Sequence, residues 1–130
     1  MLQSAPLTRI PRKEIIFSAR DWKGREVILL KTVLKQHVSR FHVDEVLILD
    51  TLKKQLAAPR VVVENPGAKS EQAIYDIPSG GHPCLLVAIK YKRVMGRWFG
   101  NLIATLYGIE ESQIPPGKVL YGNRNPPSAT

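Results

Sequence analysis

The hydrophobic positions of this chain fall into short runs separated by turn residues, and the first two runs predict a hairpin. Residues 14–18 and 26–30 are largely apolar, and the polar segment between them contains Gly24. Two β-prone runs joined by a short polar segment with a glycine are typical of paired antiparallel strands. We therefore expect a β-hairpin near the beginning of the fold.

Between residues 31 and 57 the apolar spacing changes to that of helices. The first stretch repeats at intervals of three and four residues through Val33, Leu34, His37, Val38 and Phe41. A second stripe starts after Asp44, which is a favourable N-cap, and stops before Pro59. The pattern predicts one helix that ends near Phe41 and another over about residues 45–57.

After Pro59 the pattern returns to strands. The run 60–64 is rich in valine, a shorter strand is expected around Tyr75, and the stretches 84–91 and 98–109 are long and β-prone. We expect the last two to form the central hairpin of an antiparallel sheet. The predicted fold class is α+β, with the N-terminal hairpin and the two helices packed on one face of a mainly antiparallel, twisted sheet of about four to five strands.

Length and composition favour a single domain. Residues 1–13 and 115–130 contain prolines and little apolar surface, so we expect an N-terminal tail and a proline-rich C-terminal tail around one domain at 14–114. The chain lacks the apolar region of a signal peptide and any run of about 18 apolar residues, which argues against secretion and membrane spanning. The single cysteine, Cys84, begins an apolar run and predicts a buried thiol in a cytoplasmic protein, with a nucleophile as the alternative.

Charge narrows the class of partner. The formal net charge of +8 makes nucleic acid the first expected partner, although a basic surface also serves solubility alone. Residues 77–109 contain no Asp or Glu, and their basic residues are Lys90, Lys92, Arg93 and Arg97. Strand alternation puts Lys90 and Lys92 on one face. The aromatic side chains nearby would either stack on bases or belong to the core: Tyr91, Trp98, Phe99 and Tyr107.

The histidines are the other candidate chemistry. His37 and His42 are five residues apart, which separates them by about 140° around a helix. A zinc pair on one helix needs a spacing of four, and His82 in a Gly-Gly-His-Pro loop is an unconvincing third ligand, so we expect neither a metal nor a cofactor. The alternative is structural: His37 flanks the core and His42 helps the chain turn into Asp44.

The order of the segments resembles a known superfamily over roughly residues 15–110. The chain has a helix with the residues His37-Val-Ser-Arg-Phe-His42, an apolar strand that ends in Lys90 and a last strand that reads Ile103-Ala-Thr-Leu-Tyr107. This order resembles the phage-associated branch of the nuclease superfamily that unites barnase, EndoU, the colicin ribonucleases and the RelE toxins (BECR). The branch often has His-x-x-x-Arg-His-Pro-Glu in its helix, whereas here Arg40 stands one place early, and Val43 and Asp44 replace Pro and Glu.

The resemblance implies a BECR/RelE-like fold and a toxin-like, metal-independent endoribonuclease. It would place His37 and His42 on the helical side, facing a sheet that carries Lys90, Thr105 and Tyr107. One imidazole would deprotonate the ribose 2′-OH, a second acid would protonate the leaving 5′-oxygen, and Lys90 or Arg97 would stabilise the phosphorane.

In the same interpretation Thr105 and Tyr107, two residues apart and thus on one face, would orient the phosphate or a base. The remaining basic residues would bind RNA: Arg40, Lys92, Arg93 and Arg97. Two alternatives stay open, namely an RNA-binding module without catalysis and a basic domain that binds an acidic antitoxin or immunity protein. The sequence does not indicate the oligomeric state.

Overall fold

The computed structural model describes residues 8–41, 45–65, 67, 70–77 and 83–124. In chain order its elements are β1 (Thr8–Arg9), the 3₁₀ turn η1 (Arg12–Glu14), β2 (Ile15–Arg20), β3 (Glu26–Leu30), α1 (Lys31–Phe41), α2 (Glu45–Gln55), β4 (Val61–Asn65), β5 (Ser70–Asp76), β6 (Cys84–Met95), β7 (Trp98–Ile109), the 3₁₀ turn η3 (Glu111–Gln113) and β8 (Val119–Gly122). None of the helices in these ranges is long and apolar enough to cross a membrane.

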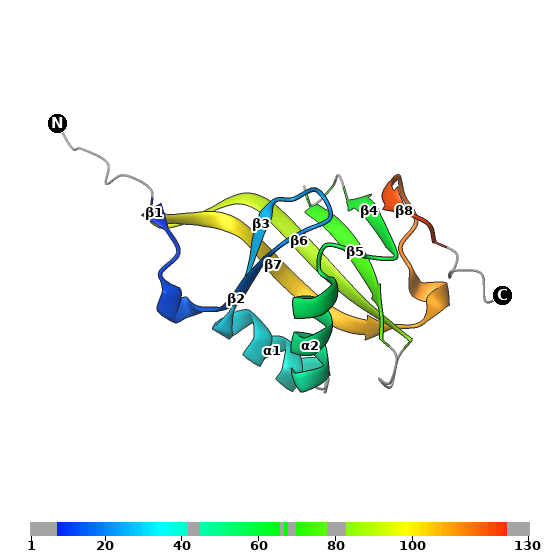
Figure 1. The fold of residues 1–130 in the computed structure, drawn as a ribbon, viewed down its shortest axis with the longest axis horizontal. Helices are drawn as coiled ribbons and strands as arrows, with labels where there is room; N and C mark the ends of the chain where they lie inside the picture. The colour runs from blue at the N-terminus through cyan, green and yellow to red at the C-terminus, as the bar shows by residue number, and fades with distance from the viewer. Residues whose placement is uncertain (1–7, 42–44, 66, 68–69, 78–82, 125–130) are drawn as a thin grey trace.

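The eight strands of the described residues belong to one mixed sheet, and Figure 1 shows them side by side. Seven of them follow the order β2-β3-β7-β6-β5-β4-β8, and β1 pairs with the first two residues of β7, Trp98 and Phe99. Both β1 and β3 run parallel to β7, whereas the other neighbouring pairs are antiparallel. The long β6–β7 hairpin is therefore the centre of the sheet, as predicted.

The predicted α+β fold class, with a sheet of four to five mainly antiparallel strands, is wrong. The described residues are mostly β and contribute eight strands to one mixed sheet, although both helices lie where the spacing placed them. The β2–β3 hairpin is not packed on the sheet. It continues the sheet through the parallel pairing of Ile28 with Leu102. Two further strands, β1 and β8, lie within the segments expected to be tails. These strands have two and four residues, too few to show an alternating pattern.

The two helices cover one face of the sheet, called here the helix face. Leu34 from α1 and Leu52 from α2 are almost completely buried against it. Their main sheet partners are also buried: Val27, Leu29, Val87, Ile89, Ile103 and Leu106. Each such aliphatic side chain contributes about 1.5–3 kcal/mol on leaving water. The phenol of buried Tyr75 donates a 2.8 Å hydrogen bond to the Leu56 carbonyl and joins β5 to the end of α2.

The opposite face, called here the open face, is also partly buried. Tyr107 and Ile114 pack against one buried cluster on this face. That cluster contains residues of β4, β5, β6 and β7: Val61, Val63, Ile74, Cys84, Leu86, Ala88 and Ile109. A second cluster contains Ile10, Ile28 and Leu102. Burial on both faces explains why the strands read as continuous apolar runs rather than as alternating patterns.

Candidate nucleic-acid interface

The three predicted sheet residues lie together on the open face. Thr105 pairs with Ala88, and Tyr107 pairs with Leu86, so each shares a face with a residue of the open-face core. Lys90 follows Ala88 by two residues and therefore projects from the same face. Lys90, Thr105 and Tyr107 are all half-buried, which leaves part of each side chain accessible to a ligand.

A β-bulge puts these residues on that face. Ala88 pairs with Thr105 while Ile89 pairs with Ile103, so Ala104 has no partner across the β6–β7 ladder. In a regular strand Ile103 and Thr105 would project from the same face. The extra residue sends Ile103 to the helix face and Thr105 to the open face.

Strand geometry puts the three side chains in one row along the open face. Thr105 and Tyr107 are two residues apart along β7, which corresponds to about 7 Å. Lys90 is diagonal to Thr105 across the ladder, at a similar separation of about 7–8 Å. Thr105 therefore lies between Lys90 and Tyr107, which are about 14 Å apart along the sheet.

The predicted helical residues do not join this group. His37 and Arg40 belong to α1, which packs on the helix face through Leu34. Their side chains lie outside the described residues, as do His42 and His82 entirely. The sheet register therefore differs from the arrangement that the resemblance implies, because Lys90, Thr105 and Tyr107 face away from the helix that carries His37.

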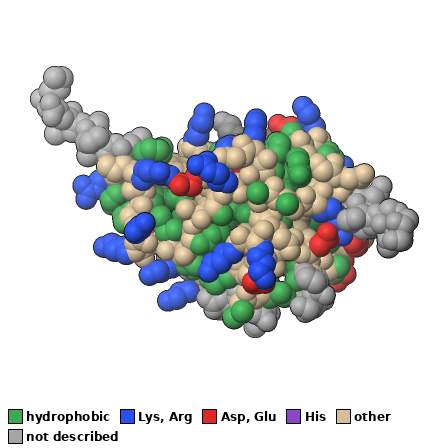
Figure 2. All heavy atoms as spheres, viewed as in Figure 1, with side chains coloured by type: hydrophobic (Ala, Val, Ile, Leu, Met, Phe, Trp, Pro, Cys, Tyr) green, Lys and Arg blue, Asp and Glu red, His purple; other side chains and the backbone are tan. Residues whose placement is uncertain are grey.

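Most of the predicted RNA-binding residues occupy the end of the β6–β7 hairpin, residues 92–99, called here the basic arm. Lys92, Arg93 and Arg97 are exposed on it, and the Arg97 guanidinium lies 5.7 Å from the centre of the Trp98 ring. Figure 1 shows this hairpin end extending past the helices beside β1. In Figure 2 Lys and Arg side chains gather over this end of the molecule, and acidic side chains gather at the opposite end.

The basic arm begins at a second bulge, which interrupts the strand alternation at Lys92. The β6–β7 register shifts between Lys90 and Arg93, and Lys92 has a φ of +54°. Arg93 pairs with Gly100, whose Cβ would point at Ile10 and Ile28 in the open-face core. Arg93 therefore returns to the face of Lys90, so the simple alternation that predicted the face of Lys92 does not hold across the bulge.

Asn101 fastens this bulge to the neighbouring strand. Its Oδ1 accepts a 2.9 Å hydrogen bond from the Lys92 amide, and its Nδ2 donates a 2.9 Å bond to the Glu26 carbonyl. A polar residue that satisfies two backbone groups holds both strands in place, since an unpaired backbone group costs about 1–3 kcal/mol. The basic arm is thus joined to β3 as well as to the rest of the β6–β7 hairpin.

A partly buried polar network lies on the other side of the bulge, and sequence reasoning missed it. Tyr91 projects to the helix face and donates a 2.6 Å hydrogen bond to Asp21 Oδ2. Arg25 lies 3.8 Å from the centre of the Tyr91 ring and forms 2.9 Å ion pairs with Asp21 and Glu71. Trp22 donates a 2.9 Å bond to Glu71 Oε1. Tyr91 is therefore occupied here and does not serve as a stacking surface.

The pKa shifts of the network follow from these contacts. Burial raises the pKa of Asp21, but hydrogen bonds from Tyr91, Arg25 and the Lys23 amide outweigh it and lower that pKa below the usual value. Burial and the Asp21 hydrogen bond raise the pKa of Tyr91. Near neutral pH Asp21 is therefore a carboxylate and Tyr91 a neutral phenol, which matches donor to acceptor.

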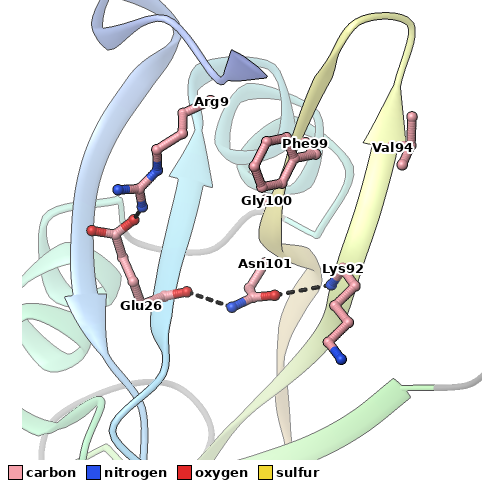
Figure 3. A pocket seen from close by; sticks show the side chains of 7 residues that line it. All are labelled: Arg9, Glu26, Lys92, Val94, Phe99, Gly100 and Asn101. Carbon is pink, nitrogen blue, oxygen red and sulfur yellow. Dashed lines mark hydrogen bonds and ion pairs between the residues drawn. The ribbon is translucent and has the colours of Figure 1, made fainter. Parts of the chain in front are cut away.

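Two adjoining pockets lie beside the basic arm and share Arg9 and Glu26, which form an ion pair. The first, of about 380 Å³, is drawn in Figure 3 and is lined by Arg9, Glu26, Lys92, Val94, Phe99, Gly100 and Asn101. The second, of about 650 Å³, is lined by the N-terminal segment and the first hairpin: Arg9, Ile10, Arg12, Ile15, Ile16, Phe17, Ser18, Glu26 and Ile28. Sequence patterns gave no sign of either, because their walls come from distant segments.

The structure gives less support to a cysteine nucleophile or a metal site. Cys84 is buried, as predicted, and burial raises the pKa of its thiol, which disfavours the nucleophilic thiolate. Within the ranges that the structure covers, no three His, Cys, Asp or Glu residues are grouped as metal ligands.

The candidate site thus has two adjoining parts, the Lys90 group on the open face and the basic arm with its pockets. Both are defined by residues of β6 and β7 and by the two bulges between them. No protein-family model, curated protein or solved structure matches the chain.

Proposed function

We propose that this protein is a metal-independent endoribonuclease that holds RNA on the basic arm and cleaves it at the open face of β6 and β7. The observation that carries the proposal is the grouping of Lys90, Thr105 and Tyr107 on one accessible face, beside exposed basic residues. A cytoplasmic location, where RNA is available, belongs to the same proposal.

The chemistry uses the substrate's own hydroxyl as the nucleophile. The ribose 2′-oxygen attacks phosphorus while a base accepts its proton, and the bond to the 5′-oxygen breaks as an acid returns a proton to that oxygen. The Lys90 ammonium offsets the additional negative charge of the phosphorane. Thr105 and Tyr107 donate hydrogen bonds to its non-bridging oxygens. Because α1 packs on the helix face, His37 is not assigned a proton transfer at this phosphate. His42 stays the proposed proton carrier and is tested by substitution.

The basic arm supplies affinity through phosphate contacts. Each Lys or Arg that neutralises a phosphate releases condensed counterions, so the affinity falls as salt rises. Lys92, Arg93 and Arg97 would provide about three such contacts on one strand of RNA. An acidic antitoxin or immunity protein would be attracted to the same arm and would compete with RNA.

Cleavage of a labelled single-stranded RNA in EDTA tests the proposal. We expect products with 2′,3′-cyclic phosphate ends, and we expect Lys90→Ala to reduce the cleavage rate by about 10²–10³-fold, as for other preorganised charge-stabilising groups. Lys118→Ala is the matched control, because Lys118 is exposed near β8 at the other end of the molecule. Equal rates for Lys90→Ala and the wild-type protein would contradict the assigned role.

A non-catalytic RNA-binding module is the second candidate, and the packing of α1 on the helix face favours it. In that case RNA would stay intact over a wide pH range while binding remained dependent on salt. His42→Ala separates the two functions, since it would abolish cleavage by the proposed enzyme and leave binding by the module unchanged. The absence of both cleavage and binding would exclude both candidates.

A further inference from the structure

The pocket of about 380 Å³ beside the basic arm has the features of a site for one unpaired nucleotide. Its walls come from the N-terminal segment, β3 and both strands of the arm. Figure 3 shows the Phe99 ring between Arg9 and Val94, with Asn101 and Lys92 further along the same strands. An aromatic ring, a free ammonium group and a fixed amide therefore line one hollow.

Phe99 provides a stacking surface that the core does not use. It is 38% exposed, and Val94, its partner across the ladder, is 57% exposed. A large apolar side chain on a strand normally packs inward, whereas these two are presented to solvent beside a cavity. Exposed aromatic rings on sheets are the usual platforms on which unpaired bases stack.

The charges around Phe99 suit a phosphate group. Lys92 is exposed on the positive-φ bulge, and the hydrogen bond from its amide to Asn101 holds that bulge in place. The carboxylate of Glu26 also lines the pocket, but it is paired with Arg9. With two basic residues and one acidic residue, the lining is positive overall and accepts an anion.

We propose that this pocket binds one nucleotide of single-stranded RNA, with the base stacked on Phe99 and its phosphate beside Lys92. The inference rests on the proposed function for the identity of the ligand, but not on cleavage. Duplex RNA is excluded from the pocket because the faces of its bases are already stacked on one another. Stacking and charge do not read the 2′-hydroxyl, so single-stranded DNA of the same sequence would fill the pocket equally well.

Fluorescence polarisation with a labelled, 2′-O-methylated single strand measures binding without cleavage. We expect Phe99→Leu to weaken binding about tenfold and Phe99→Trp to retain it, because only the latter keeps a stacking surface. Tyr121→Leu is the matched control, since Tyr121 is an aromatic residue of similar exposure, 40%, on β8. Circular dichroism of each variant verifies the fold.

A strand with one base removed at successive positions gives a second readout that does not depend on the stability of the variants. At one position the missing base should weaken binding to the wild-type protein and leave binding to Phe99→Leu unchanged. Equal penalties in both proteins, or wild-type affinity of Phe99→Leu, would overturn the nucleotide pocket. Either result would leave RNA cleavage and the effect of Lys90→Ala intact, so the two proposals fail separately.

Discussion

At Lys92 the backbone has a φ of +54°, a conformation that costs a non-glycine residue about 1–2 kcal/mol. The hydrogen bond that the Lys92 amide donates to Asn101 Oδ1 and the packing of Tyr91 on the helix face hold the residue in this conformation. Lys92 lines the smaller pocket at this bulge. Local strain is thus found where a ligand site is proposed, as is common for strained backbone.

A pair of substitutions measures this strain. Lys92→Ala and Lys92→Gly both remove the charge, but only glycine adopts a positive φ without a steric cost. We therefore expect the free energy of unfolding of Lys92→Gly to exceed that of Lys92→Ala by about 1 kcal/mol in urea titrations. The reverse order would show that Lys92 is not held in this conformation. Both variants should bind RNA more weakly than the wild-type protein does.

Among the elements, the turn between β2 and β3 depends on a charged contact rather than on apolar packing. Asp21 has a fully buried side chain and receives hydrogen bonds from the amides of Lys23 and Arg25 as well as from the Arg25 guanidinium. Glu71 on β5 receives two further bonds from Arg25. One arginine therefore joins this turn to the middle of the sheet.

Removal of that arginine leaves two carboxylates with too few partners. We expect Arg25→Met to lower the free energy of unfolding by about 3–5 kcal/mol, because breaking a buried ion pair leaves an uncompensated charge. The control is Lys23→Ala, which removes an exposed side chain and should change the stability by less than about 0.5 kcal/mol. Similar urea midpoints for the two variants would show that the contacts of Arg25 do not stabilise the fold.

The elements also show which parts of the fold could be predicted from sequence. Local periodicity located α1, α2 and the long strands β6 and β7, because each has enough residues to repeat its pattern. The bulges at Ala104 and Lys92 arise from pairing with the opposite strand, which periodicity within one strand does not report. The same holds for the parallel contact of Ile28 with Leu102 and for the pockets, which bring distant segments together.

For the whole molecule, charge is divided between the two ends. The C-terminal end carries an acidic contact with buried Arg60, which forms a 2.7 Å bond to Glu111 and pairs also with Asp76. This contact attaches η3 to the sheet and lowers the pKa of Glu111. Because Lys and Arg side chains gather at the end with the basic arm, a polyanion is attracted there and RNA would approach the arm first.

Acid should destabilise the fold through its carboxylates. Asp21 and Glu111 both have a lowered pKa in the folded protein, so their stabilising effect is complete above the usual carboxylate pKa of about 4 and is lost as the pH falls through the folded value. We expect urea midpoints to be constant from neutral pH to about 5 and to decrease below about 4. Asp21→Asn should reduce that decrease. Stability that rose on acidification would contradict the sign.

The bulge at Ala104 has a consequence for the length of the chain. On β7 the even-numbered residues before it, Gly100 and Leu102, face the same way as the odd-numbered residues after it, Thr105 and Tyr107. Parity changes at this one position. Deletion of another residue of β7 would move all the side chains on one side of the deletion to the opposite face of the sheet. Deletion of Ala104 would leave every other side chain of β7 on its present face. Among related chains, this is where β7 is free to differ in length and still present the same residues.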